Sequence, residues 1–288
     1  MTFKQKTCRM GKSTKPASAK WKPLMEGLEA LKLENYRMLL TIDSSSSIAF
    51  SLQISPGDIA IVARFLDDPD TAIRKNAAWG LADAASKGID MSSTIPALAN
   101  ALSSENGDIL WPAEEALARA AEKGTDISVA VPALAKLLFS EDVLVHSSAV
   151  VALDNAAKMG TDISDAILGL TSILSSSNTI AWPNATGLLE ITIVNMKTRD
   201  ITLEALFNAY CGSDENTRSR ITQIIVKAAQ TSDHPLRVAI TSAIMNFANT
   251  ARFVYEAEQN STLYQEMVGN LQRIISNIRN RETRSEIS

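Results

Sequence analysis

Apolar and polar positions recur along most of this chain with a period of 36 residues. From about residue 56, each period opens with apolar side chains spaced i, i+3 and i+7, which is the spacing of one helical face. A fixed period between about 20 and 50 residues is typical of a solenoid. The apolar positions of the five periods are Ile59, Val62 and Leu66, then Ile95, Leu98 and Leu102, then Val131, Leu134 and Leu138, then Ile167, Leu170 and Leu174, and finally Leu203, Leu206 and Tyr210.

Each period predicts a second helix after a short polar turn. The turn carries Asp or Asn at one register position, where a side-chain oxygen can cap the first N–H groups of the helix. The buried face of the helix is predicted from Ala77, Leu81 and their equivalents. Gly88, Gly124 and Gly160 follow its end, where a left-handed residue favours glycine, whereas Met196 predicts a different linker in the next period. The five capping residues are Asp70, Asn106, Asp142, Asn178 and Asp214.

The 36-residue register fails at both ends of the chain. We expect a flexible basic arm over residues 1–20 and an atypical helical cap over 21–54, with one helix beginning at Pro23, more helix over 35–42 and a short helix over 48–54. Five repeats over residues 55–230 should be followed by a helical hairpin cap over 231–280 and a polar tail over 281–288. In that hairpin, Asp233 should cap a helix with a buried face of Leu236, Ile240, Ile244 and Phe247, and a last helix should run from about Thr262 to Arg279.

The sequence therefore predicts an all-α, right-handed solenoid of stacked antiparallel helix pairs with atypical helical caps. The string D-P-D-x-x-I-R-x-x-A-A at 68–78, followed by an Ala/Leu helix that ends in Gly, resembles the HEAT repeat of the armadillo-like solenoids, in its short prokaryotic form. The resemblance covers roughly residues 56–230, and it implies that the second helices line a concave, binding face. The Asp and Arg of the family pattern occur together only at Asp70 and Arg74, so an Asp–Arg ladder is not expected beyond the first repeat.

Helical phase predicts which positions of the second helices face outward. With the core direction set by positions 73, 77, 80, 81 and 84, the outward positions are 75, 79, 82 and 86 plus multiples of 36, and position 83 lies on the flank. Trp79 and Trp111 interrupt a pattern of small residues there, and an exposed Trp is a favoured interface anchor. The alternative is that each indole folds against a neighbouring repeat.

These positions give a set of candidate partner-binding residues. The acidic residues of this set, together with Glu122, would make the concave groove negative. The alternative is that they form an ordinary solvated charged face. The candidates are Lys75, Trp79, Asp83, Trp111, Glu115, Arg119, His146, Asp154, Asn155, Trp182 and Glu190.

Charge is distributed unevenly along the chain, although the formal net charge is only −4. Residues 1–22 contain seven Lys or Arg and no acid, whereas residues 56–196 contain 18 acids and eight Lys or Arg. An acidic body disfavours nucleic acid, whose binding depends on Lys and Arg. It favours a basic protein or peptide as the partner, or the basic arm itself as an autoinhibitory occupant.

Cysteine usage and hydropathy bear on localisation. Cys8 and Cys211 are the only cysteines, which gives no disulfide framework and indicates a reducing compartment. No apolar run reaches signal-peptide or membrane-spanning length. We expect a cytoplasmic protein without membrane contact, with a transit peptide over residues 1–22 as the weaker alternative.

Catalytic chemistry finds little support in the sequence. His146 and His234 are the only histidines and have no Cys or carboxylate at ligand spacing, so we expect no metal or other cofactor. No phosphate-binding loop or nucleophile–base set is present. We therefore expect a non-enzymatic scaffold or adaptor. Two alternatives stay open, namely a HEAT-like alkylpurine DNA glycosylase, with Trp111, Glu115 and Trp182 as its site, and a phycobilin-lyase-like subunit.

Overall fold

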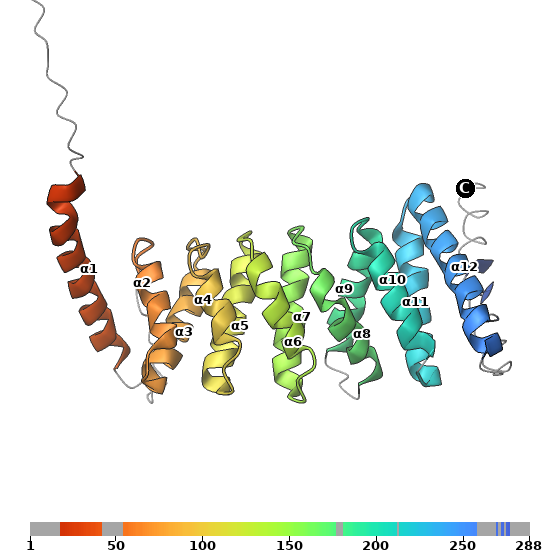
Figure 1. The fold of residues 1–288 in the computed structure, drawn as a ribbon, viewed down its shortest axis with the longest axis horizontal. Helices are drawn as coiled ribbons and strands as arrows, with labels where there is room; N and C mark the ends of the chain where they lie inside the picture. Colours follow the sequence, from red (N-terminus) through yellow and green to blue (C-terminus); the bar gives the residue numbers. More distant parts are fainter. Residues whose placement is uncertain are drawn as a thin grey trace, which may run out of the picture.

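A computed structural model describes residues 18–41, 54–176, 181–211 and 213–257, together with residues 269, 272, 273, 275 and 276. Within these residues all regular secondary structure is helical, and the helices stack side by side in chain order (Figure 1). The all-α solenoid that the sequence predicts is therefore confirmed. The expectations for the basic arm before residue 18, the short helix over 48–54, the cap at Asn178 and the tail over 281–288 lie outside the described residues, as does most of the last helix.

Five helix pairs make up the body of the stack. In each pair a short first helix is followed by a longer second helix, and 3-10 segments at Arg64–Asp67, Ser128–Ala130 and Ser164–Ala166 extend three of the first helices. The pairs are α2 (Ile59–Ala63) with α3 (Thr71–Ser86), α4 (Ile95–Ala101) with α5 (Gly107–Glu122), α6 (Val131–Leu137) with α7 (Val143–Lys158), α8 (Ile167–Ser175) with α9 (Trp182–Val194), and α10 (Arg199–Cys211) with α11 (Glu215–Thr231).

The predicted capping residues begin the second helices. The side chains of Asp70, Asn106, Asp142 and Asp214 each accept a hydrogen bond from a backbone N–H in the first turn that follows. The three repeat-ending glycines have φ angles of 76° at Gly88, 89° at Gly124 and 85° at Gly160, which is the left-handed conformation that favours Gly. The second helix of the following pair, α9, ends instead at Val194 with an extended Asn195, so the linker at Met196 differs as expected.

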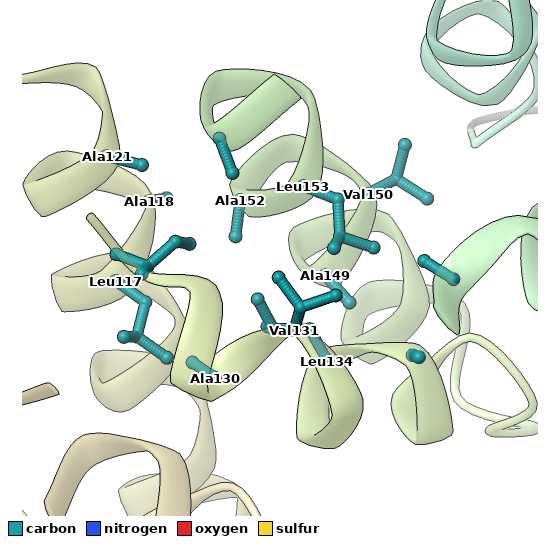
Figure 2. Close-up of a cluster of buried hydrophobic side chains, with 14 of the residues drawn as sticks. Leu117, Ala118, Ala121, Ala130, Val131, Leu134, Ala149, Val150, Ala152 and Leu153 are labelled. Carbon is teal, nitrogen blue, oxygen red and sulfur yellow. The ribbon is translucent and has the colours of Figure 1, made fainter. Parts of the chain in front are cut away.

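The apolar register positions form one continuous core along the stack. Leu117 of α5, Leu134 of α6 and Leu153 of α7 are fully buried in one layer of it (Figure 2). The second helices approach one another through small residues such as Ala118 and Ala152. Neighbouring second helices are also tied by a side-chain amide, since Asn155 of α7 donates to the carbonyl of Ala118 at 3.0 Å.

One helix, α1 (Ser18–Leu40), forms the N-terminal end of the described stack. It begins five residues before Pro23, so the predicted start at Pro23 was wrong, whereas the helix predicted from residue 35 is confirmed as far as Leu40. Proline inside a helix removes one backbone hydrogen bond, and the rest of the helix continues around that loss. The inner side of the helix joins the first repeat, as Asn76 of α3 donates to the carbonyl of Leu40 at 2.7 Å.

At the other end lies α12 (His234–Ala257). As predicted, Asp233 caps it by accepting from the N–H of Leu236, and Ile240 and Ile244 are buried. The side chain of Phe247 is not among those described. Helical residues at 269, 272–273 and 275–276 belong to the region predicted as the last helix, and Ile275 packs against the core. No helix among the described residues is long and apolar enough to span a membrane.

Candidate functional site

Three of the four outward positions of the second helices are solvent-facing in the structure. Positions 75, 79 and 86 and their equivalents are exposed or partly exposed from α3 to α9, as the sequence predicts. Position 82 is different, because Ala82 and Ala118 are buried against the neighbouring second helix. The prediction for this position was wrong, since each second helix has flanking helices as well as a first helix to pack on. Asp154 and Glu190 occupy the same position and are only partly exposed.

The exposed side of α3, α5 and α7 carries four exposed large apolar side chains, Trp79, Trp111, Leu144 and Val151, which we together call the tryptophan face. Trp79 is 50% exposed and Trp111 is 42% exposed. The indole of Trp111 lies back over the first turn of its own helix. A Cβ added to Gly107 in that turn would stand 3.8 Å from the indole ring. Neither indole is buried by a neighbouring repeat. Leu144, which is 54% exposed, was not among the partner-binding residues predicted from the sequence.

A groove of about 640 Å³ adjoins the tryptophan face between the second and third helix pairs. Trp111 and Leu110 of α5 form one wall, and Asp142 and Val145 at the start of α7 form the other. The ends of α4 and α6 complete it with Leu102, Glu105 and Lys136. The groove therefore combines an apolar lining with charged groups at its rim, which is the usual composition of a binding site.

Glu114 is a buried carboxyl group on α5, near Asp142 of the groove wall. It lies on α5 one turn beyond Leu110 and Trp111, it is fully buried, and neither of its side-chain oxygens has a hydrogen-bond partner. Burial, together with a smaller contribution from the nearby carboxylate of Asp142, raises the pKa of Glu114 to about 8. Sequence reasoning missed this residue, although its register equivalents Ala78 and Val150 are a visible sign of a buried position.

The acids predicted to form a negative groove are all ion-paired in the structure. Arg119 lies between Glu115 and Glu122, at 2.8 and 3.1 Å. Asp154 pairs with Lys158, and Glu190 pairs with Lys227 of α11. Two further candidates are also paired, since Lys75 contacts Asp108 at 3.1 Å and Asp83 contacts Lys87. These pairs offset much of the negative charge of the second-helix surface, although Arg119 alone serves both Glu115 and Glu122.

Two further candidates make contacts within the stack. His146 is buried, so it cannot contact a partner in this conformation. The indole N–H of Trp182 donates to the carbonyl of Ile173 at 3.0 Å, and the guanidinium of Arg220 lies 3.4 Å from the centre of its ring. Trp182, which is partly exposed, therefore joins α8, α9 and α11, and its role in partner binding stays a prediction, whereas burial contradicts that role for His146. Asn155, which is partly exposed, likewise serves the contact with α5 described above.

The Asp–Arg ladder is absent even from the first repeat. Arg74 donates to the carbonyls of Asp68 and Pro69 and to the hydroxyl of Thr71, within its own inter-helix turn. The carboxylate of Asp70 is used as the helix cap. Arg74 thus stabilises the turn of one repeat rather than the junction between two.

The residues that the structure describes bear on two of the chemical hypotheses, a metal site and a glycosylase site. No group of three or more His, Cys, Asp or Glu side chains in that part of the chain could hold a metal ion. Trp111 and Glu115 lie one turn apart on α5, but Trp182 lies on α9, on the far side of α7 (Figure 1). The three residues named for a glycosylase site therefore do not converge.

Comparisons with known proteins concern the fold. No protein-family model matches the sequence, and no curated protein matches it significantly. Among solved structures, an engineered protein from the Northeast Structural Genomics Consortium is similar at 23% identity, with 77% of this chain and 97% of that chain covered and a TM-score of 0.49. A designed armadillo repeat protein is similar at 16% identity, covering 76% and 99% with a TM-score of 0.49. Another, solved in complex with the peptide (KR)4, has 16% identity, coverages of 77% and 99% and a TM-score of 0.49.

Proposed function

We propose that this chain is a non-enzymatic scaffold that binds a protein or peptide segment across the tryptophan face and the adjoining groove. The observation that carries the proposal is the pair Trp79 and Trp111, half-exposed on neighbouring second helices, with Trp111 also forming a wall of the groove. Large aromatic side chains held on rigid helices lose little conformational freedom on binding, and Trp is enriched among the residues that dominate binding energy.

The groove supports an apolar side chain as one element of the partner segment. Its lining includes Leu102, Leu110 and Val145, beside the exposed edge of Trp111. An aliphatic or aromatic residue inserted there would remove apolar surface from water on both molecules, at about 25 cal/mol for each Å² buried. The rest of the segment would then extend over Leu144 and Val151 of the tryptophan face.

The rim of the groove favours a basic residue as the second element. Glu105 and Asp142 both line the groove, and in the described part of the chain neither forms an ion pair. Lys136 offsets part of their charge. A Lys or Arg beside the apolar anchor would complement these carboxylates, so the basic partner that we predicted would be selected here rather than along the ion-paired second helices.

The direct test is peptide selection followed by mutation of the tryptophan face. Peptides enriched on the wild-type chain from a random displayed library should bind the Trp79→Ala/Trp111→Ala double variant at least about tenfold more weakly, because hot-spot truncations typically cost 2 kcal/mol or more, about 30-fold. Leu168→Ala is the matched control, since Leu168 is an apolar residue on α8, outside the face, and is even more exposed at 67%. Unchanged affinity in the double variant would refute the proposed site.

The basic preference is tested separately with Glu105→Gln/Asp142→Asn. Asparagine is as good an N-cap as aspartate, so the second change removes charge without removing the cap of α7. Selected peptides that contain Lys or Arg should lose about five- to tenfold in affinity and become less sensitive to salt, while uncharged analogues should not change. Equal losses for both kinds of peptide would contradict the basic preference and leave the site itself intact.

A further inference from the structure

The terminal helix α1 has two opposite faces with different surroundings. Leu33, Tyr36 and Leu40 point inward and pack against the core. On the same side, Lys32 and the hydroxyl of Tyr36 donate to the buried carboxylate of Asp58, and the contact with Lys32 is the main reason that the pKa of Asp58 is lowered. This inner face fixes how α1 is rotated on the stack.

The opposite face of α1 is apolar and open to solvent. Leu31 is 59% exposed and Met38 is 66% exposed, and Leu28 and Leu39 are also exposed. Asn35 lies between them on the same stripe and is exposed. Among the described residues α1 is the first element of the stack, with its outer side directed away from every other helix (Figure 1). The outer face of a terminal solenoid element is ordinarily polar, because nothing covers it.

We propose that this outer face of α1 pairs with the same face of a second copy of this chain, giving a two-fold dimer through parallel α1 helices. Leu28, Leu31, Asn35 and Met38 alternate in steps of three and four residues, and Leu24 continues the spacing in the sequence. This is the a/d spacing of a two-stranded coiled coil, with leucine and methionine at d and Leu28 and Asn35 at a. Leu33 and Leu40 take the f positions, diametrically opposite the seam, which are the positions buried on the stack.

Asn35 selects a second copy in parallel orientation. A single Asn at an a position pairs with its own counterpart across a parallel two-fold axis, and this specifies register and oligomer state. An antiparallel pair would set Asn35 against an apolar d residue.

The size of the apolar face sets the expected strength of the dimer. Four half-exposed apolar side chains on each helix offer roughly 300–400 Å² per copy, or about 600–800 Å² in total. This lies below the roughly 1,200 Å² of a standard stable interface. We therefore expect a concentration-dependent dimer with a Kd of about 10–200 μM, in which the two stacks extend away from each other.

Sedimentation velocity on the full-length chain from about 5 to 400 μM tests the dimer. The wild type should pass from monomer to dimer, and Leu31→Lys and Met38→Lys should each raise the Kd at least tenfold while the helical circular dichroism stays unchanged. Val238→Lys is the matched control, because Val238 is an exposed apolar residue on α12 at the other end of the stack. A monomeric wild type at every concentration would overturn the proposal, and so would association that is lost with Val238→Lys instead.

Orientation is tested by Asn35→Cys in a chain whose own cysteines, Cys8 and Cys211, are changed to Ser. Under mild oxidation, the introduced cysteines of a parallel pair should form a disulfide that joins position 35 to position 35, and mass spectrometry should identify it. Leu168→Cys in the same background should give no cross-link at equal concentration. A dimer seen by sedimentation that forms no disulfide between the two copies of residue 35 would refute the parallel arrangement of α1.

Discussion

At the scale of single residues, Glu114 makes the sharpest stability prediction. Its pKa of about 8 in the folded protein lies above the ordinary value of 4.5 that it has in the unfolded chain. Between these two values the unfolded chain loses this proton and the folded protein keeps it, so Glu114 lowers stability as pH rises, by about 1.4 kcal/mol per pH unit. Glu114→Gln removes the titration, so the variant should gain about 2–4 kcal/mol on the wild type between pH 5 and pH 8.

Chemical unfolding at pH 5 and pH 8 measures this difference. Glu115→Gln controls for the removal of a carboxylate from the same helix, because Glu115 is exposed and paired with Arg119. A difference between wild type and Glu114→Gln that stays constant with pH would show that the carboxyl finds a partner, such as an ordered water, that stabilises its charged form.

Residue-level sequence reasoning succeeded where a role is local. The capping by Asp70, Asn106, Asp142 and Asp214 follows from a side chain and the N–H groups two or three residues ahead, so spacing along the chain is sufficient. The roles of Glu114, His146 and Trp182 depend on neighbours about 30 to 40 residues away, or on how helix stacks pack sideways. A helical phase based on one core direction could not separate these buried or partly buried residues from exposed ones.

At the scale of elements, Gly169 shows how tightly adjacent first helices pack. A Cβ at this position of α8 would stand 2.7 Å from the Cβ and a terminal methyl of Leu138, which is itself buried. Because the Cβ of Leu138 is tied to its backbone, the helices must separate to make room. Gly169→Ala should therefore destabilise the protein by about 1–3 kcal/mol, against its better intrinsic helix propensity.

A second helical glycine provides the opposite expectation. Gly187 lies inside α9, and a Cβ there would meet nothing within 4 Å. Gly187→Ala should therefore stabilise the protein by about 0.5–1 kcal/mol through helix propensity alone. Equilibrium denaturation of the two variants checks both signs. Stabilisation by Gly169→Ala would mean that α6 and α8 are less closely packed than the structure shows.

The ends of elements were less predictable than their existence. The apolar register found both helices of all five pairs, because each buried position recurs in five copies. It had no copies to compare in α1, and there the presence of Pro23 suggested a helix start five residues too late. The exposed seam of α1 was equally hard to predict, because helical spacing of Leu28 and Leu31 does not show whether they face the stack or solvent. The structure shows that the inner face consists of Leu33, Tyr36 and Leu40.

At the scale of the whole molecule, stability should vary along the stack. In a solenoid each repeat contacts only its neighbours, so stability is roughly a sum of repeat and interface contributions. The second helices α5 and α7 each have a second helix on both sides, whereas within the described stack α1 has neighbours on one side and α12 has beyond it only the short helical pieces at 269, 272–273 and 275–276 (Figure 1). The ends should open more often than the centre, because opening an end breaks one interface and opening the centre breaks two.

Amide hydrogen exchange read out by mass spectrometry tests this gradient. At about 5 μM, where the chain should be monomeric, amides of α1 and α12 should exchange at least about tenfold faster than those of α5 and α7. Raising the concentration to about 400 μM should slow exchange in α1 and leave α12 unchanged, because only α1 gains a neighbour in the proposed dimer. Equal protection from end to end would contradict nearest-neighbour stability and indicate a single cooperative unit. Slowing of α12 with concentration would place the association at the opposite end of the stack.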